Sequence, residues 1–194
     1  NFGSSFNVWR GADVVGEMVL RVPGVHNVYN ALAAIAVGFE LEVPFEKIVE
    51  GLHNFTGAGR RFQAKGEVNG VLVVDDYGHH PTEIKATLAA AKQGWKDRRL
   101  VVLFQPHRYT RTRDLLEDFA KSFDQSDVLF LADIYAAGEQ PIPGVSGAKL
   151  AEVVRASGHP SVTFVEHKEQ LVDQVLPHLK SGDIVMTLGA GDTW

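Results

Sequence analysis

The 194-residue chain has no cysteine, which excludes disulfides, thiolate metal sites and cysteine nucleophiles and fits a reducing compartment. No apolar run approaches the roughly 18 residues that a membrane-spanning helix needs. Basic residues are few: 19 lysines and arginines are outnumbered by 24 aspartates and glutamates, for a net charge of −5. Because a nucleic-acid-binding surface is normally basic, we do not expect a nucleic acid as a partner. The lack of a long apolar run likewise leads us to expect no membrane partner.

A phosphate loop of the form G-x-x-x-x-G-K-[ST] is also missing from the sequence. Any chemistry with ATP would therefore need a phosphate loop from sequence outside these 194 residues. The start, Asn1-Phe2-Gly3, has no methionine, and it lacks the basic and apolar segments of a signal peptide. We therefore expect a piece of a longer protein.

Apolar strands alternate with amphipathic helical segments in the larger, later part of the sequence. A mostly parallel sheet with helices on both faces buries strands of this kind, so we predict a Rossmann-like α/β domain. The expected strands are Val71–Asp75, Leu100–Phe104, Asp127–Ala132, Ser161–Val165 and Asp183–Leu188. The expected buried helix positions are Ile84, Leu88, Ala91 and Trp95, then Leu116, Phe119, Ala120 and Phe123, then Leu150, Val153 and Val154, and finally Val172, Val175, Leu176 and Leu179.

The earlier part of the chain has a different pattern and predicts a smaller fragment. Short β-like runs in residues 6–22 precede a turn at Pro23-Gly24, and a helix is expected from about His26 to Leu41. Asn69-Gly70, later on, reads as a tight hairpin turn. The glycine-rich segment 56–59 is the expected hinge between domains of residues 1–57 and 58–194. The expected stripes of the two helices before it are Val28, Leu32, Ile35 and Phe39, and Phe45, Ile48, Val49 and Leu52.

The segment Asp75-Asp76-Tyr77-Gly78-His79-His80-Pro81 stands where a buried strand becomes a helix. In open α/β sheets, ligands bind at the carboxyl ends of the strands. Asp76 is suited to accept hydrogen bonds from ribose hydroxyls, and His79 to bind a carboxylate or accept a proton near neutral pH. Only one of two adjacent histidines need serve a site, and the other can cap the helix. The Asp-Asp and His-His pairs also leave a metal site open.

A second polar loop, from Gln105 to Thr112, follows the next strand. It brings Arg108, Arg111 and Arg113 together beside His107 in an acidic protein, and such a cluster favours an anion site because like charges repel. The alternative is a solvated helix start. The positive end of the helix dipole, however, disfavours arginine there.

Two further pairs of residues are candidate ligand contacts. Asn27 and Asn30 are three apart on one face near a helix start, and an asparagine amide can pair with the edge of a purine. The alternative is that they only cap the helix. Arg60 and Arg61 follow the hinge, where an arginine can meet a phosphate or simply remain solvated.

Several of these segments, in this order, resemble the Mur ligases of bacterial cell-wall synthesis, and the second loop is similar to that of the members that add alanine. The matching segments are Val22 to Ala34, Gly59 to Gln63, Asp75 to Ile84, Phe104 to Thr112, and Tyr135 to Glu139. The resemblance implies that residues 1–57 are an incomplete remnant of a central ATP-binding domain and that residues 58–194 bind the incoming amino acid. The phosphate loop and most magnesium ligands would lie in other parts of the enzyme.

The activity implied by the resemblance is ATP-driven, Mg²⁺-dependent joining of L-alanine to the lactyl carboxylate of UDP-N-acetylmuramate in the bacterial cytoplasm. An acyl phosphate would be the intermediate. The resemblance assigns His26, Asn27 and Asn30 to adenine, Arg61 to an ATP phosphate, Asp76 to the ribose, His79 as catalytic residue, and Tyr77, His79, His107, Arg108 and Arg111 to alanine. On the residues alone, a metal-dependent phosphoesterase and a non-catalytic ligand-binding module remain as alternatives.

Overall fold

A computed structural model describes residues 3–191 of the chain. Its contacts divide the chain into two compact units, Asn1–Gly59 and Arg60–Trp194. This division falls at the end of the glycine-rich segment that the sequence marks as a hinge. Residues 1–2 and 192–194, at the ends of the two predicted domains, lie outside the described residues. None of the helices formed by residues 3–191 has the length and apolar character needed to cross a membrane.

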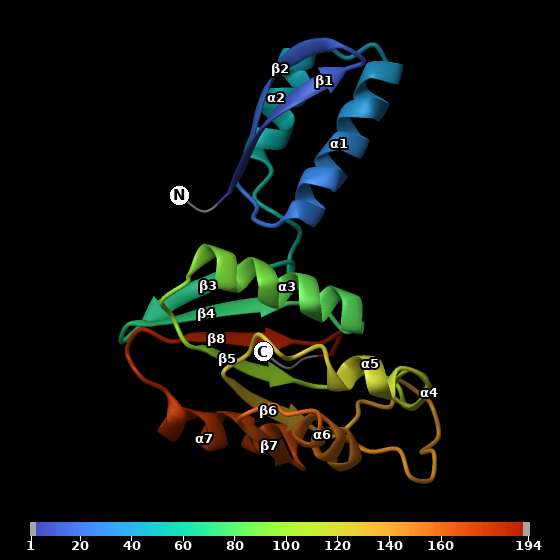
Figure 1. The fold of residues 1–194 in the computed structure, drawn as a ribbon, viewed down its shortest axis with the longest axis vertical. Helices are drawn as coiled ribbons and strands as arrows, with labels where there is room; N and C mark the ends of the chain where they lie inside the picture. Colours follow the sequence, from blue (N-terminus) through green and yellow to red (C-terminus); the bar gives the residue numbers. More distant parts are fainter. Residues whose placement is uncertain (1–2, 192–194) are drawn as a thin grey trace. The chain divides into compact units, whose positions relative to one another are not determined.

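The first unit packs two helices against a β-hairpin (Figure 1). Its elements are β1 (Ser4–Arg10), β2 (Asp13–Leu20), α1 (Val25–Glu40) and α2 (Phe45–Asn54), and the two strands pair antiparallel. The stripe predicted for α1 is wrong at Leu32, which is exposed. Ala31 is buried instead, because the face of α1 toward the hairpin runs through Val28, Ala31 and Ile35.

The second unit contains a six-stranded sheet with the order β3-β4-β8-β5-β6-β7. All five predicted parallel strands are confirmed to within one residue at each end. The strand β3 pairs antiparallel with β4 through Asn69 and Gly70, whose φ angles of 51° and 78° are those of the expected tight turn. The strands are β3 (Gln63–Val68), β4 (Val71–Asp76), β5 (Leu100–Phe104), β6 (Val128–Ala132), β7 (Val162–Val165) and β8 (Ile184–Leu188).

Helices cover both faces of this sheet, as predicted (Figure 1). Right-handed crossovers explain which helix lies on which face. The chain steps in one direction from β4 through β5 and β6 to β7, so the connecting helices share a face, whereas the return from β7 to β8 places its helix on the other. The shared face carries α3 (Pro81–Gly94), α5 (Leu116–Ala120) and α6 (Gly147–Ala156), and the opposite face carries α7 (Leu171–Val175).

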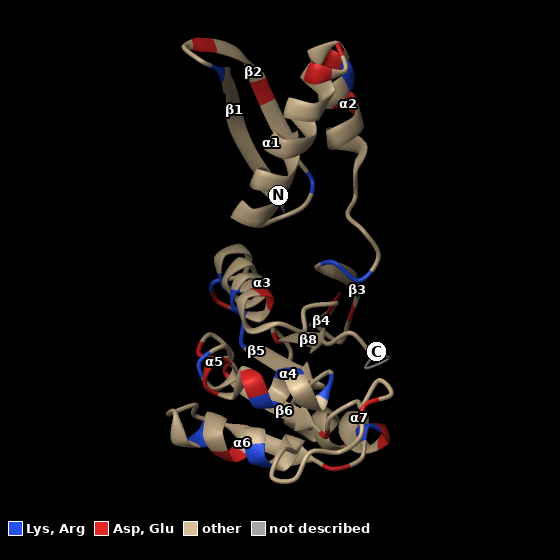
Figure 2. Cartoon of the chain, turned by 90° about the vertical axis from the view of Figure 1, so that its right-hand side faces the viewer, with Lys and Arg blue, Asp and Glu red and all other residues tan. Residues whose placement is uncertain are grey.

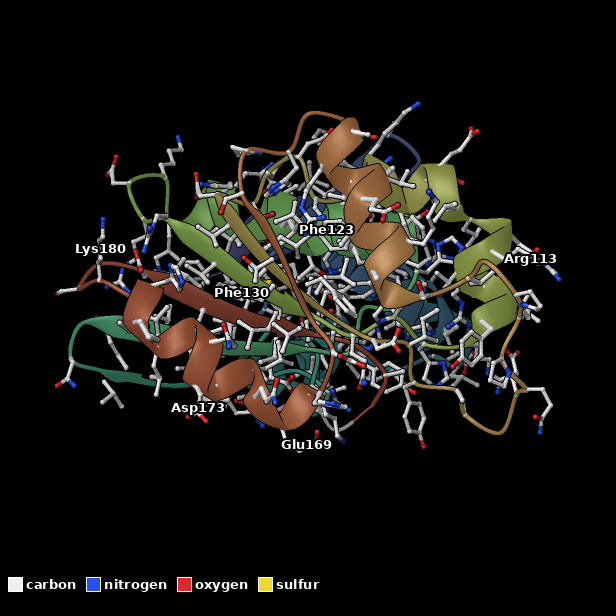
Figure 3. The ribbon with its side chains drawn as sticks, turned by 90° about the horizontal axis from the view of Figure 1, so that it is seen from below. Arg113, Phe123, Phe130, Glu169, Asp173 and Lys180 are labelled. Carbon is white, nitrogen blue, oxygen red and sulfur yellow. The ribbon has the colours of Figure 1, made fainter. Side chains whose placement is uncertain are left out.

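The stripe predicted for α7 and the turn after it is confirmed at Val175 and Leu179, which pack against the sheet, and is wrong at Val172 and Leu176. Leu171 and Val175 are buried against the sheet, whereas Val172 and Leu176 are exposed. The α-helix has only five residues and is flanked by the 3-10 turns Lys168–Gln170 and Leu176–His178, so regular 3.6-residue spacing does not persist. Figure 3 shows acidic side chains, Glu169 and Asp173, along the outer side of this segment.

Candidate active site

Four rings from three loops form a chain of contacts at the carboxyl edge of the sheet. Tyr77 and His79 follow β4, His107 follows β5, and Tyr135 follows β6. The ring centroids are 5.1 Å apart for Tyr77 and His79, 5.7 Å for His79 and His107, and 5.5 Å for His107 and Tyr135. Because β4, β5 and β6 run parallel and end on the same edge, the two polar loops identified in the sequence come together there.

His79 is held in one tautomer by its own loop. Its Nδ1 lies 3.0 Å from the carbonyl oxygen of Tyr77. A carbonyl oxygen only accepts hydrogen bonds, so Nδ1 carries the proton and the neutral ring has an unprotonated Nε2. His79 is thereby prepared to accept a hydrogen bond or a proton at Nε2.

The start of α3 fixes this loop through Glu83. Oε2 of Glu83 accepts hydrogen bonds from the backbone N–H groups of His79 at 3.1 Å and His80 at 3.2 Å. The ring of His80 accepts from the backbone N–H of Thr82 at 3.3 Å, so His80 caps the helix, as the sequence allowed for one of the two histidines. Burial raises the pKa of Glu83, but the backbone N–H and ring of His79, the N–H of His80 and the Arg61 guanidinium together lower it below its usual value.

His107 has the opposite tautomer. Nη1 of Arg111 lies 3.4 Å from its Nδ1 and 3.3 Å from its carbonyl oxygen. A guanidinium only donates hydrogen bonds, so Nδ1 accepts and Nε2 carries the proton. Burial lowers the pKa of His107, and the charges of His79, Arg111 and Arg108 lower it further, against an opposing effect of Glu139. The neutral ring is therefore a hydrogen-bond donor at Nε2 beside an acceptor at His79.

Arg108 stands at the N-cap of α4 (Tyr109–Asp114) with a left-handed φ of 75°. Within residues 3–191 its guanidinium makes no hydrogen bond or ion pair. Its backbone N–H donates to the carbonyl oxygen of Tyr135 at 2.9 Å, which ties the second loop to the loop after β6. Glu139 holds the same two loops together by accepting from the N–H and hydroxyl of Thr110 at 3.0 and 2.6 Å.

The third arginine of the predicted cluster does not belong to it. Arg113 pairs with Asp114 at 2.7 Å and projects outward at the edge of the second unit (Figure 3). Arg111 and Arg113 both lie in the last turn of α4, where the helix dipole favours positive charge. The alternative of a solvated helix start, and the dipole argument against it, therefore apply to Arg108 alone.

The two arginines after the hinge differ in their surroundings. Arg60 donates from Nε to Asp75 at 3.0 Å and from Nη2 to the carbonyl oxygen of Gly189 at 2.8 Å, and 21% of its side chain is exposed. Arg61 is 51% exposed, and its Nη1 lies 3.7 Å from Oε1 of Glu83. Both guanidinium carbons lie near the Tyr77 ring, 5.4 and 5.5 Å from its centroid. Arg61 is therefore the one with freedom to meet a ligand, and Figure 2 shows this basic segment just before β3.

The two aspartates at the end of β4 are both engaged by the protein. Asp76 is 5% exposed and accepts hydrogen bonds from the N–H groups of Phe62 and Gly78 and the hydroxyl of Thr87. Asp75 is fully buried between Arg60 and Thr187. Among the described residues, no three His, Asp or Glu side chains are grouped in a way that could hold a metal ion.

The predicted adenine contacts lie in the first unit, on the first two turns of α1. The amide nitrogen of Asn27 donates to the carbonyl oxygen of Pro23 at 2.7 Å, and that of Asn30 lies 3.4 Å from Oδ1 of Asn27. The two asparagines thus share a face, as expected. The alternative that they cap the helix is wrong, because the N-cap is Gly24. His26 and Asn30 are exposed.

Two residues of this edge, Tyr135 and Glu83, are not among the site residues predicted from the sequence. Tyr135 follows β6 as His107 follows β5, so the signal for it was its position after a predicted strand. Glu83 stands three residues after the cap residue His80, which is the spacing of a capping box.

Comparison with known proteins identifies the family of these loops. A family model described as "Mur ligase, glutamate ligase domain" matches residues 60–191. A UDP-N-acetylmuramate–L-alanine ligase of Geotalea daltonii is 58% identical over 191 residues, which cover 98% of this chain and 42% of that protein. The ligase of the same name from Geobacter sulfurreducens is 59% identical over 180 residues, covering 93% of this chain and 39% of that one.

Two solved structures of ligases are similar to this chain over nearly its whole length. The crystal structure of the UDP-N-acetylmuramate–alanine ligase MurC from Thermotoga maritima superposes with a TM-score of 0.83 at 29% identity, covering 98% of this chain and 40% of that one. A murein peptide ligase from Psychrobacter arcticus superposes with a TM-score of 0.68 at 27% identity, covering 98% and 39%. The chain therefore spans about two fifths of the length of these relatives.

Proposed function

The chain belongs to the Mur ligase family, and from this we propose that it is part of an ATP-dependent ligase that joins L-alanine to the lactyl carboxylate of UDP-N-acetylmuramate. Two relatives that share more than half of its residues carry that name. The reaction would supply a precursor of bacterial peptidoglycan. Its substrates point to the bacterial cytoplasm as the place of action.

The observation that carries the proposal is the junction of the two loops at the sheet edge. An imidazole with an unprotonated Nε2, His79, lies 5.7 Å from the ring of His107, and His107 contacts Arg111. A free amino acid has a carboxylate and an ammonium group, and this edge offers a partner for each. Arg108 and Arg111 would bind the carboxylate, for which the planar guanidinium is suited. Tyr77 and His107 would line the site.

The ammonium group of alanine must lose a proton before its nitrogen can attack. Nε2 of His79 would take that proton, and the hydrogen bond of Nδ1 to the Tyr77 carbonyl oxygen supports this role because it leaves Nε2 as the accepting nitrogen. The lactyl carboxylate would first take the γ-phosphate of ATP, giving ADP and an acyl phosphate. The alanine nitrogen would then attack the acyl carbon, and a tetrahedral intermediate would expel phosphate and leave the amide. Positioning and charge neutralisation are what proteins contribute to such phosphoryl chemistry.

The ATP-binding residues are proposed from the family resemblance. His26, Asn27 and Asn30 would bind adenine, and the exposed positions of His26 and Asn30 are compatible with that role. Arg61 would bind a phosphate. Asp76 is proposed for the ribose, although its carboxylate already accepts from three protein groups, so a ribose hydroxyl would have to replace one of them or add to them.

Magnesium would accompany ATP. The described residues do not fit a Mg²⁺ site, because no three acidic or histidine side chains gather around one point. We propose that its ligands lie in other parts of the enzyme. The same observation gives no support to a metal-dependent phosphoesterase.

A comparison of the full-length enzyme with the 194-residue chain tests the proposal. With ATP, Mg²⁺, UDP-N-acetylmuramate and L-alanine, the full-length enzyme should form UDP-N-acetylmuramoyl-L-alanine and release one phosphate per product. The chain alone should form none, because it has no phosphate loop. A full-length enzyme that releases phosphate without joining alanine, or turnover by the chain alone, would contradict the proposal.

A further inference from the structure

The two carboxylate oxygens of Glu83 contact different parts of the candidate site. Oε1 lies 3.7 Å from Nη1 of Arg61. Oε2 lies 3.8 Å from Nδ1 of His79 and accepts the backbone N–H of the same residue at 3.1 Å. One side chain on α3 is therefore shared between the arginine assigned to an ATP phosphate and the histidine assigned to alanine.

We propose that Glu83 is a positioning residue that couples phosphate binding at Arg61 to alanine binding at His79. The inference rests on the proposed function, which assigns those two residues to ATP and alanine. Without nucleotide, Arg61 and His79 both attract the same carboxylate. A bound phosphate carries more negative charge than a carboxylate, so it draws the Arg61 guanidinium away and leaves Glu83 to His79.

The consequence for His79 is electrostatic. When His79 takes a proton from the alanine ammonium, it becomes an imidazolium, and a carboxylate 3.8 Å from its Nδ1 stabilises that charge. The other groups that contact the His79 ring are Tyr77 and His107. Burial and nearby positive charge lower the pKa of His107. Among the described residues, Glu83 is the only anionic side chain in contact with His79. Proton acceptance at His79 is then favoured once nucleotide has bound.

Tyr77 provides a second connection between the same two residues. Its ring lies 5.5 Å from the guanidinium carbon of Arg61 and meets the edge of the His79 ring at 5.1 Å. Its carbonyl oxygen accepts from Nδ1 of His79. Glu83 and Tyr77 each contact both Arg61 and His79, so a displacement of Arg61 changes the surroundings of both of these neighbours of His79.

Glu83 also caps α3, and the experiment must separate that role from the coupling. Glu83→Gln keeps an oxygen that can accept the N–H groups of His79 and His80, but it removes the charge that attracts Arg61 and an imidazolium. Arg61→Ala leaves the carboxylate permanently available to His79. In both variants the affinity for alanine should therefore no longer depend on nucleotide, but it should be high in Arg61→Ala and low in Glu83→Gln. A purely structural role of Glu83 does not predict this difference.

The measurement is the dissociation constant of L-alanine by calorimetry in the full-length enzyme. UDP-N-acetylmuramate is present throughout, and a non-hydrolysable ATP analogue is present or absent. In the parent enzyme the analogue should tighten alanine binding by about fivefold or more. Arg61→Ala should bind alanine tightly with or without the analogue. Glu83→Gln should bind it weakly in both cases. A Glu83→Gln enzyme that keeps the parental ratio would overturn the proposal.

Controls separate this inference from the proposed function. His80→Ala removes the ring that caps α3, so it should lower the melting temperature and keep the parental ratio. If Glu83→Gln does not fold, Arg61→Ala alone tests the proposal. An alanine dissociation constant that still depends on the ATP analogue in Arg61→Ala would contradict the coupling. If Arg61→Ala binds the analogue like the parent and Arg108→Ala binds alanine like the parent, the site assignments of the proposed function are wrong instead.

Discussion

The imidazole of His107 stacks on the phenol ring of Tyr135, with ring centroids 5.5 Å apart and planes inclined by 28°. The backbones of the two residues are paired as well, since the N–H of Tyr135 donates to the carbonyl oxygen of Pro106 at 2.9 Å. Tyr135 remains 44% exposed. The His107 ring thus contacts both Tyr135 and His79.

Loss of this stacking should weaken alanine binding without affecting ATP. Tyr135→Ala removes a ring contact worth about 0.5–1.5 kcal/mol, so the KM for alanine should rise roughly two- to tenfold. Tyr135→Phe retains the ring and should behave like the parent. Steady-state kinetics of the full-length enzyme with alanine as the varied substrate give both values. An unchanged KM in Tyr135→Ala would show that Tyr135 is not needed to hold His107.

Arg108 should carry much of the affinity for the amino-acid carboxylate. A hydrogen bond to a charged group contributes about 1.5–3 kcal/mol, so Arg108→Ala should raise the KM for alanine roughly ten- to a hundredfold and leave the KM for ATP nearly unchanged. Arg113→Ala is the matched control, because Arg113 pairs with Asp114 and projects outward at the edge of the second unit (Figure 3). Unchanged alanine kinetics in Arg108→Ala would remove this residue from the site.

The fold was largely predictable because its signals are local. A strand buried on both faces is almost wholly apolar, as in Leu100–Phe104, and it can be read from five consecutive residues. The insertion of β8 between β4 and β5 depends on pairing between residues more than 80 positions apart, and no local pattern records that partner. The site was predictable to the extent that parallel strands end on a common edge.

The parts of the site that the sequence did not reveal depend on contacts across loops. Arg60 and Arg61 are equivalent in the sequence, and it is the contacts of Arg60 with the buried Asp75 and with the carbonyl oxygen of Gly189 that distinguish the anchored arginine from the exposed one. Tyr135 enters the site through its stacking on His107, from a loop 28 positions later in the chain. Which side chains meet across these loops depends on the order of the strands in the sheet. The spacing of residues along the sequence does not determine that order.

The hydrogen-bonded pair of the buried Ser126 and the half-buried His159 should make the stability of the chain depend on pH. The Ser126 hydroxyl donates to the carbonyl oxygen of Phe123, so Nε2 of His159, 2.8 Å away, donates to Ser126, while Nδ1 accepts the N–H of Ser161 at 3.2 Å. Both ring nitrogens are thus used in the neutral form. Burial lowers the pKa of His159 despite opposing effects of its hydrogen-bond partners and of Asp124.

The lowered pKa of His159 determines how the stability of the folded chain changes with pH. The unfolded chain, with a histidine pKa of about 6.5, binds the proton more readily than the folded chain, so folded stability is full above that pH and is lost as the pH falls below it. Urea unfolding of the chain between about pH 7.5 and 5 should show this decline, and His159→Gln should flatten it. His167→Gln, which removes an exposed imidazole outside this network, should keep the parental slope. An equal slope in His159→Gln and the parent would contradict the assignment.

Gly147, the first residue of α6, should tolerate no side chain. A Cβ at this position would lie 2.5 Å from the carbonyl oxygen of Ala132 and 2.8 Å from Cα of Asp133, both backbone atoms at the end of β6. Its N–H also donates to Oδ1 of Asp133 at 2.7 Å, so the helix cannot move away without loss of that bond. Gly147→Ala should therefore lower the free energy of unfolding by about 1–3 kcal/mol.

Gly51→Ala is the matched control, because Gly51 lies within α2 and nothing stands within 4 Å of its added Cβ. It should raise stability by roughly 0.5–1 kcal/mol through higher helix propensity. Opposite changes in the urea midpoints of the two variants are the expected result. A Gly147→Ala chain as stable as the parent would mean that β6 and α6 can move apart at this point without a loss of stability. It would contradict the inference that the close approach of Gly147 to Ala132 and Asp133 holds the loop after β6 in place.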